Sequence, residues 1–298
     1  MNSSVLPIPA TKASVFRYFS RLRLLDILVL QGPPLLGAAF AIPHPSRHMG
    51  TLAALVVANV FLVTHIFMLN DWSGLTTDLA DPNKAAGVFT ARGVGRAELG
   101  ILTTGLLITS LLLFSRLGPI TLGLSLAIAT LSALYSLPRL HWKGRPFLNS
   151  AVHLAGGILH FLLGYSLGHA IDGRGVAIAT FFALIFAAGH LTQETRDYHG
   201  DAFNAITTNA VSFGPRRTFA ASLVLFSAAQ ILFLLLALNG ILPRALAALV
   251  VLYPIQILWS HEALRDGLTY ASVSRLQARY RALYALVGLA MVAALYAR

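Results

Sequence analysis

The sequence contains no cysteine and few charged side chains. Without cysteine, the chain forms no disulfide and carries out no thiol chemistry. Charged residues make up 11% of the 298 residues, whereas a soluble domain is about a quarter charged. Hydrophobic residues make up 56%, and the mean hydropathy is +0.72. A chain of this composition cannot bury all its apolar surface in a globule, so we expect it to lie in a lipid bilayer.

Most of the chain consists of long apolar runs. Nine of them are long enough, or nearly so, to cross roughly 30 Å of hydrocarbon, and short connections join them. The sequence therefore predicts an all-α integral membrane bundle of nine transmembrane helices. We expect residues 1–298 to form a single membrane domain, with residues 1–23 as a cytosolic N-terminal lead-in. The runs are Leu24–Ile42, Thr51–Leu69, Leu99–Leu117, Ile120–Tyr135, Phe147–Gly168, Val176–Leu191, Phe219–Leu238, Leu242–Trp259 and Leu283–Tyr296.

The basic residues indicate how the bundle is oriented. A net charge of +11 could suggest a nucleic-acid partner, but the placement of the positive residues argues against one. If the N-terminus lies in the cytoplasm, 17 of the 22 Lys and Arg residues fall on the cytoplasmic side. Membrane proteins show this positive-inside asymmetry. The sequence therefore predicts a multi-pass protein with a cytoplasmic N-terminus and no nucleic-acid partner.

Acidic residues are scarce, and most of them are clustered. The chain has 11, and six of these gather in two short segments that each follow an apolar run. In the second segment, Glu194, Asp197 and Asp201 lie at positions i, i+3 and i+7. On a helix this spacing places all three on one face. The sequence therefore predicts a cluster of carboxylates at one end of a helix.

The first acidic segment has a similar arrangement. Asp71 and Asp78 are seven residues apart, so they face the same way if the helix continues, and Asn70 adds an amide oxygen. Asp81 lies three residues farther on. The topology predicted from the basic residues puts both acidic segments on the cytoplasmic face. We therefore expect the active site at that face.

Carboxylate oxygens grouped in this way favour Mg²⁺, which takes one or two carboxylates and completes its shell with water and substrate phosphates. Two such clusters facing each other through Mg²⁺ would hold a diphosphate. Bound metal would stabilise the diphosphate as it leaves. The alternative is that these are solvated carboxylates at helix ends, but acidic residues at membrane depth are costly and usually functional. The candidate metal ligands are Asn70, Asp71, Asp78, Asp197 and Asp201, of which the four aspartates are also the candidate catalytic residues.

Basic and polar residues near the acidic segments are candidates for binding the substrate. Lys and Arg form charge-assisted hydrogen bonds to phosphate oxygens. The connection between the fourth and fifth runs reads YSLPRLHWKGRPFLN. For each basic residue the alternative is plain positive-inside bias. The candidate substrate-binding residues are Asn70, Lys84, Tyr135, Arg139, Lys143, Asn149, Glu194 and Arg196.

Four histidines lie within apolar runs or at their ends: His65, His153, His160 and His190. A buried histidine is most often a hydrogen-bonded structural residue. One of these could instead orient an acceptor or take its proton.

The two acidic segments and the basic loop resemble those of the UbiA superfamily of intramembrane prenyltransferases, along nearly the whole chain. The first aspartate motif of that family, Asn-Asp-x-x-Asp-x-x-x-Asp, is similar to residues 70–78. Its second motif, Asp-x-x-x-Asp, often with an acid three residues before it, is similar to residues 194–201. The stretch with Tyr135, Ser136, Lys143 and Asn149 resembles the family's Tyr-Ser…Lys…Asn loop. Gly74 departs from the pattern, because the family has an aspartate there.

The resemblance implies a helical bundle around a central cavity, with Mg²⁺ as cofactor and a prenyl diphosphate under the cytoplasmic loops. It implies an allylic carbocation that a hydrophobic or aromatic acceptor attacks. Two alternatives stay open. A membrane terpene cyclase of the same architecture would need no acceptor, and the altered first motif favours it. An ion-coupled transporter would also use intramembrane carboxylates, but it would usually place them near the midplane.

Overall fold

The computed structural model describes residues 24–81, 85 and 88–297, and that part of the chain forms helices and no strands. This confirms the predicted all-α class. The elements are α2 (Leu24–Val29), α3 (Gly32–Ala41), η1 (Pro45–His48), α4 (Met49–Ser73), α5 (Leu75–Ala80), η3 (Phe89–Arg92), α6 (Arg96–Leu117), α7 (Pro119–Ser136), η4 (Trp142–Gly144), α8 (Leu148–Tyr165), α9 (Gly173–Phe203), α10 (Asn209–Phe213), α11 (Pro215–Leu238), η5 (Arg244–Leu252), α12 (Tyr253–Arg265) and α13 (Tyr270–Tyr296), where η marks a 3₁₀ helix.

The chain is an integral membrane protein. Within the described residues, eight helical stretches are long and apolar enough to cross a membrane, and they correspond to eight of the nine predicted runs. The remaining run forms α8, an 18-residue helix that is not among the eight. Its polar residues Asn149, His153 and His160 lower its apolar character. The count of nine spans and the central cavity stay predictions.

Several helices begin or end away from the predicted boundaries. The first run is divided into α2 and α3, because Pro33 and Pro34 lack backbone N–H groups and fit the first turn of a new helix. α9 has 31 residues and continues well past Leu191, so the second acidic segment is helical, as predicted. α13 begins at Tyr270 and extends the last run by more than three turns.

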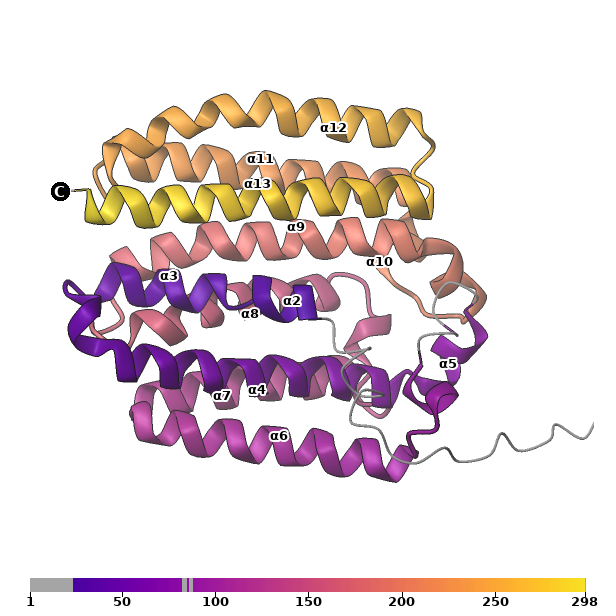
Figure 1. The fold of residues 1–298 in the computed structure, drawn as a ribbon. Coiled ribbons are helices and arrows are strands. Elements are labelled where there is room, and N and C mark those ends of the chain that lie inside the picture. Colours follow the sequence, from indigo (N-terminus) through magenta and orange to yellow (C-terminus); the bar gives the residue numbers. More distant parts are fainter. Residues whose placement is uncertain (1–23, 82–84, 86–87, 298) are drawn as a thin grey trace, which may run out of the picture.

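α9 lies at the centre of the bundle and packs most extensively against α8 and α11 (Figure 1). Glycines on α8 allow its neighbours to come close. A Cβ on Gly157 would lie 2.6 Å from the Cα of Ala183 on α9, and one on Gly164 would collide with the backbone of α3. α8 continues through both Gly156 and Gly157 without a break. Close helix packing in membranes favours such small residues.

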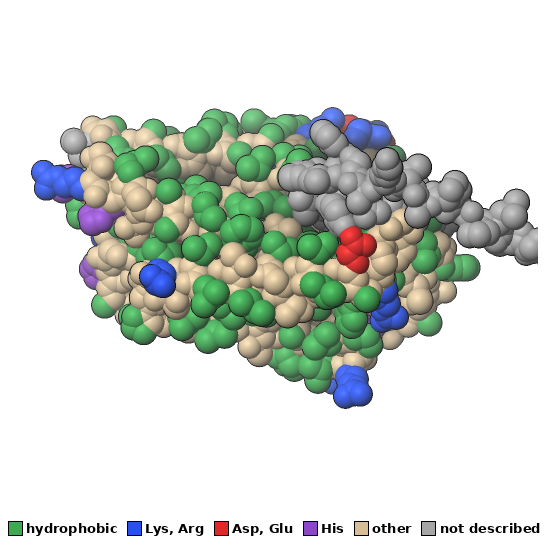
Figure 2. All heavy atoms as spheres, turned by 60° about the horizontal axis from the view of Figure 1, so that its bottom comes forward, with side chains coloured by type: hydrophobic (Ala, Val, Ile, Leu, Met, Phe, Trp, Pro, Cys, Tyr) green, Lys and Arg blue, Asp and Glu red, His purple; other side chains and the backbone are tan. Residues whose placement is uncertain are grey.

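The surface in Figure 2 is mainly apolar, and the few charged side chains lie mostly toward its two ends. Large hydrophobic side chains are widely exposed on the outer helices, for example Ile101, Val224 and Leu289 at 74%, 66% and 70%. This distribution fits helices whose outer faces contact lipid.

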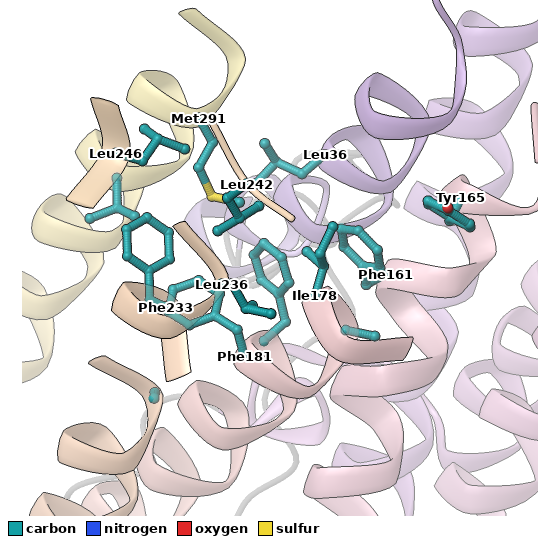
Figure 3. Close-up of a cluster of buried hydrophobic side chains, with 14 of the residues drawn as sticks. Leu36, Phe161, Tyr165, Ile178, Phe181, Phe233, Leu236, Leu242, Leu246 and Met291 are labelled. Atoms are coloured by element: carbon teal, nitrogen blue, oxygen red, sulfur yellow. The ribbon is translucent and has the colours of Figure 1, made fainter. Parts of the chain in front are cut away.

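Aromatic side chains fill the largest buried cluster. Phe161, Phe181 and Phe233 pack with aliphatic residues of α3, α11 and α13 (Figure 3). Phe181 and Phe233 have ring centroids 4.9 Å apart. These rings therefore stabilise the bundle at a distance from both acidic segments, as packing aromatics do.

Candidate functional site

The two acidic segments meet at one end of the bundle, where α5 lies beside the loop between α9 and α10 (Figure 1). Asn204, which caps the end of α9, donates a hydrogen bond of 3.1 Å from Nδ2 to the carbonyl oxygen of Thr77 in α5. The carboxylate of Asp81 lies so close to Gly200 that a Cβ at Gly200 would collide with it. Residues more than a hundred positions apart in the sequence thus lie in contact at this end of the bundle.

The first acidic segment is bent. α4 ends at Ser73, the N–H of Gly74 caps it by donating to the carbonyl of Asn70 at 2.8 Å, and α5 starts at Leu75. The helix does not continue through Gly74, so the condition under which Asp71 and Asp78 would face the same way is not met. The missing Cβ at Gly74 leaves room for Asp78, because a Cβ there would lie 3.2 Å from Asp78 Oδ2. Asn70, Asp71 and Asp78 are partly exposed.

The second acidic segment lies entirely within α9, and its carboxylates are buried. Glu194, Asp197 and Asp201 are 3%, 9% and 5% exposed. Buried carboxylates need charged or hydrogen-bonding partners, because an isolated buried charge is very costly. The partners of two of them show what this segment can do.

Asp197 is paired with its neighbour Arg196. The guanidinium donates from Nε to Oδ1 at 2.7 Å and from Nη2 to Oδ2 at 3.1 Å, so both oxygens of the carboxylate accept from it. Arg196 also donates from Nη1 to Gln277 Oε1 at 2.9 Å, and its Cζ lies 5.3 Å from the ring centroid of Tyr270. The last helix, α13, therefore reaches the second acidic segment.

Glu194 belongs to a different network, which joins α8, α9 and α10. Its Oε1 accepts a short hydrogen bond from Asn149 Nδ2 and lies 3.0 Å from His190 Nε2. Asn149 Oδ1 accepts from Asn209 Nδ2 at 2.8 Å, and Asn209 also donates to Ser150 Oγ at 3.0 Å. Asn149 and Glu194, both predicted to bind substrate, thus contact each other inside the protein.

Three rings pack together beside this network. The imidazoles of His153 and His190 are nearly parallel, with centroids 3.6 Å apart and an interplanar angle of 8°. Tyr135 meets both rings edge-on, at centroid distances of 5.2 and 6.2 Å. His153 Nδ1 is 2.8 Å from the carbonyl oxygen of Asn149. His153 of α8 therefore pairs with His190 of α9.

The basic loop between α7 and α8 approaches the same end of α9. His141 has a left-handed backbone (φ 45°, ψ 47°), which costs a non-glycine residue about 1–2 kcal/mol, and Phe147 also has a positive φ, of 64°. Asn209 Oδ1 holds this strained loop by accepting the N–H of Phe147 at 2.9 Å. Partial burial lowers the pKa of His141, and the charges of Lys143 and Arg145 lower it further. The loop is therefore an electropositive structure attached to α10.

The candidate substrate-binding residues differ in how closely they join the site. Lys143 is partly buried in the loop, and Arg139 is exposed. Lys84 lies outside the described residues. Asn209 and Gln277 were not among the residues predicted to form the site. The dipeptide Thr208-Asn209, which follows the second acidic segment, was a sequence signal that could have identified Asn209. No local pattern identifies Gln277, because it lies 81 residues from its partner Arg196.

The donor set fits a hard divalent cation. Among the described residues, no group of three or more His, Asp or Glu side chains is close enough to bind a metal alone. Mg²⁺ needs only one or two carboxylates, because water and phosphate oxygens supply the other ligands. The carboxylates of the two segments and the amide oxygen of Asn70 are ligands of the type that this ion prefers.

A match to a known protein family identifies the family of this chain. The profile described as the UbiA prenyltransferase family matches residues 32–272, which is most of the chain. The chain belongs to the UbiA prenyltransferase family. This confirms the resemblance seen in the two aspartate motifs. No curated protein matches the chain.

Solved structures of UbiA proteins share the fold. A UbiA homologue from Archaeoglobus fulgidus bound to GPP and Mg²⁺ has a TM-score of 0.71 and 18% identity, covering 93% of this chain and 99% of that one. A structure described as digeranylgeranylglyceryl phosphate synthase has a TM-score of 0.72 and 16% identity, covering 95% and 99%. The Archaeoglobus homologue was also solved with DMAPP and Mg²⁺, at a TM-score of 0.69 and 17% identity over 93% and 99% of the two chains. At these identities the likeness shows a common UbiA fold.

Proposed function

We propose that this UbiA protein is a Mg²⁺-dependent intramembrane prenyltransferase. It ionises a prenyl diphosphate and transfers the prenyl group to a hydrophobic or aromatic acceptor. The single observation that supports this best is the meeting of the two acidic segments, with Asp81 of the first against Gly200 of the second. The Mg²⁺ and prenyl diphosphates bound by the Archaeoglobus homologue are consistent with such a site.

The chain's own residues divide into three roles. Asp71, Asp78, Asp197 and Asp201 hold the diphosphate and its metal, and Asn70 assists them. Lys143 and the other basic residues near the loop neutralise phosphate charge through charge-assisted hydrogen bonds. When bound, Mg²⁺ supplies positive charge that stabilises the departing diphosphate.

The reaction needs a leaving group, a site that excludes water, and a proton acceptor. The allylic C–O bond breaks and the diphosphate leaves with the electron pair. The acceptor then forms a bond to the carbocation and loses a proton, which the departed diphosphate accepts. Apolar helices exclude the water that would otherwise capture the cation. The network of Glu194, Asn149 and Asn209 keeps the loop and α10 attached to α9, so that the basic groups stay in place.

The test is diphosphate release by the purified protein in lipid nanodiscs, given prenyl diphosphates of increasing length, Mg²⁺ and a panel of acceptors. We expect turnover that EDTA abolishes and Mg²⁺ restores. Asp71→Ala should reduce turnover by about 100-fold or more, because it removes charge stabilisation where negative charge develops. Asp266→Ala is the matched control and should retain activity, because Asp266 pairs with Arg275 at 2.8 Å outside the site.

The same experiment distinguishes the two alternative functions, a terpene cyclase and an ion-coupled transporter. A hydrocarbon or terpene alcohol formed without any acceptor would make the protein a cyclase. Full turnover of Asp71→Ala would contradict the role of the first acidic segment. No release from any prenyl diphosphate, together with coupled ion uptake in proteoliposomes, would favour a transporter.

A further inference from the structure

Three buried polar side chains inside the bundle each have an atom without a hydrogen-bond partner in the described part of the chain. They are Asn59 of α4, Ser132 of α7 and His160 of α8, at 0%, 6% and 4% exposed. The unpaired atoms of the first two are Asn59 Oδ1 and Ser132 Oγ. For His160, the carbonyl oxygen of Gly156 can accept from one ring nitrogen at most, so the other nitrogen is unpaired. Hydrocarbon offers no hydrogen-bond partner, so such atoms are costly inside a membrane.

The three polar residues come from neighbouring helices at one level of the bundle. Each lies within one turn of a member of a single hydrophobic cluster, which contains Ala58 of α4, Ala129 of α7 and Leu163 of α8. Asn59 is held there by its amide nitrogen, which donates to Gln31 Oε1 at 2.9 Å. That bond leaves its oxygen available, so this level of the bundle has polar atoms to offer.

His160 shows how deep this level lies. The centroid of its ring is 6.1 Å from that of Phe186 on α9. Phe186 is 11 residues before Asp197 on the same helix. At a rise of about 1.5 Å per residue, the polar level is about 16 Å from the second acidic segment, which is about the length of three extended isoprene units.

The face of α8 above His160 has room for an apolar chain. Gly156 is four residues before His160 and three after His153, so the three share one face of the helix. His153 stacks on His190 and His160 lies beside Phe186, so this face is turned toward α9. A Cβ on Gly156 would meet nothing within 4 Å. Open space therefore lies between the two pairs of rings.

The polar level would treat short and long tails differently. Buried polar atoms that no protein group pairs with are usually satisfied by water. An apolar tail that reached them would displace that water and leave them without partners, which weakens binding. A shorter tail ends in the open space beside Gly156 and avoids this cost.

We propose that Asn59, Ser132 and His160 form a polar floor beneath the prenyl tail and limit that tail to about three isoprene units. They determine specificity and lie too deep to contact the diphosphate. The inference rests on the proposed function, and it deepens that function by naming the substrate class, which is farnesyl diphosphate and its shorter homologues.

The experiment measures binding without turnover, so it needs no acceptor. Thiolodiphosphate analogues of dimethylallyl, geranyl, farnesyl and geranylgeranyl diphosphate, which ionise poorly, compete with a labelled geranyl analogue for the full-length protein in nanodiscs with Mg²⁺. We expect the Kd to rise about tenfold or more from the farnesyl to the geranylgeranyl analogue. Partition of each analogue into lipid is the same for every variant, so it cancels when variants are compared.

A pair of substitutions at His160 separates polarity from size. His160→Leu removes the polar atoms, so we expect the ratio of the geranylgeranyl Kd to the farnesyl Kd to fall about tenfold. His160→Gln keeps a polar side chain and should keep the wild-type ratio. His261→Leu alters an exposed histidine of α12 and should also leave the ratio unchanged.

Gly156→Leu tests the same space from the opposite direction. A side chain that fills the space should raise the Kd of the farnesyl analogue about tenfold and leave the Kd of the dimethylallyl analogue unchanged. This variant also decides the question if His160→Leu fails to fold, because equal losses for both analogues would place the tail elsewhere.

Two further results would overturn the inference. One is a wild-type ratio in His160→Leu, and the other is a ratio in His160→Gln that falls as far as in His160→Leu. Failure of the proposed function looks different: the wild-type protein would bind the analogues with this limit on length, yet it would release no diphosphate from any prenyl diphosphate.

Discussion

Asn149 is the residue on which the buried network around Glu194 depends. It donates to Glu194 Oε1 and to the carbonyl oxygen of Lys143, and it accepts from Asn209. Removing its amide leaves a buried carboxylate and a buried amide without these partners, and each orphaned polar group costs about 1–3 kcal/mol. The network therefore contributes strongly to the stability of this end of the bundle.

We expect Asn149→Ala to lower the free energy of unfolding by about 2–4 kcal/mol, which unfolding in mixed detergent micelles would measure. Asn239→Ala is a matched control. Asn239 is exposed, and its side chain bonds only to the carbonyl of Leu235 among the hydrogen bonds of the described residues. It should change stability by no more than about 0.5 kcal/mol. Equal effects of the two substitutions would contradict the importance assigned to the network.

Gly200 allows the two acidic segments to meet. A methyl group there would collide with the carboxylate of Asp81, so in Gly200→Ala that carboxylate must move away from α9. We expect the affinity for prenyl diphosphate to fall about tenfold, as a rise in KM, with little change in thermal stability. Gly189→Ala on the same helix meets open space and should keep the wild-type KM. Wild-type kinetics in Gly200→Ala would mean that the close approach is not needed.

At the scale of helices, α8 packs so closely against α3 and α9 that its backbone contacts theirs. Gly157 and Gly156 are neighbours, but only Gly157 faces α9, where a Cβ would lie 2.6 Å from Ala183 Cα. Gly157→Ala should destabilise the bundle by about 1–3 kcal/mol, because a close-packed interface cannot admit another methyl group. Gly156→Ala meets nothing within 4 Å and should be neutral or slightly stabilising. Thermal unfolding in nanodiscs would show whether the two variants differ in this order.

The bend at Gly74 shows how an element boundary shapes the site. If α4 continued as one straight helix, Asp78 would lie farther along the axis of α4. The break at Gly74 instead lets α5 lie across the end of α9, where Thr77 accepts from Asn204. The first acidic segment therefore reaches the second by changing direction, which its seven-residue spacing did not predict.

At the scale of the whole molecule, the orientation in the bilayer stays a prediction. The chain has no cysteine, so single cysteines report sidedness without background. Leu140→Cys lies in the basic loop, and His169→Cys lies in the turn at the opposite end of α8; both positions are exposed. In intact cells a membrane-impermeant maleimide should label His169→Cys at once and Leu140→Cys only after permeabilisation. The reverse pattern would place the acidic segments on the outer side.

The sequence by itself determined the class of protein and the residues of interest. Hydropathy and charge are properties of short stretches of chain, so the apolar runs, the rare acids and the basic loop could be found without coordinates. The family motifs lie in the same stretches. The predicted helical face of Glu194, Asp197 and Asp201 is confirmed, because helical periodicity is also local.

Only the tertiary structure decided which of those residues touch. Asn149 meets Asn209 across 60 positions, Arg196 meets Gln277 across 81, and His153 stacks on His190. These contacts follow from how α8, α10 and α13 pack on α9. Packing depends on the shapes of surfaces brought together by the whole fold, such as the glycine faces of α8. No single stretch of sequence contains that information.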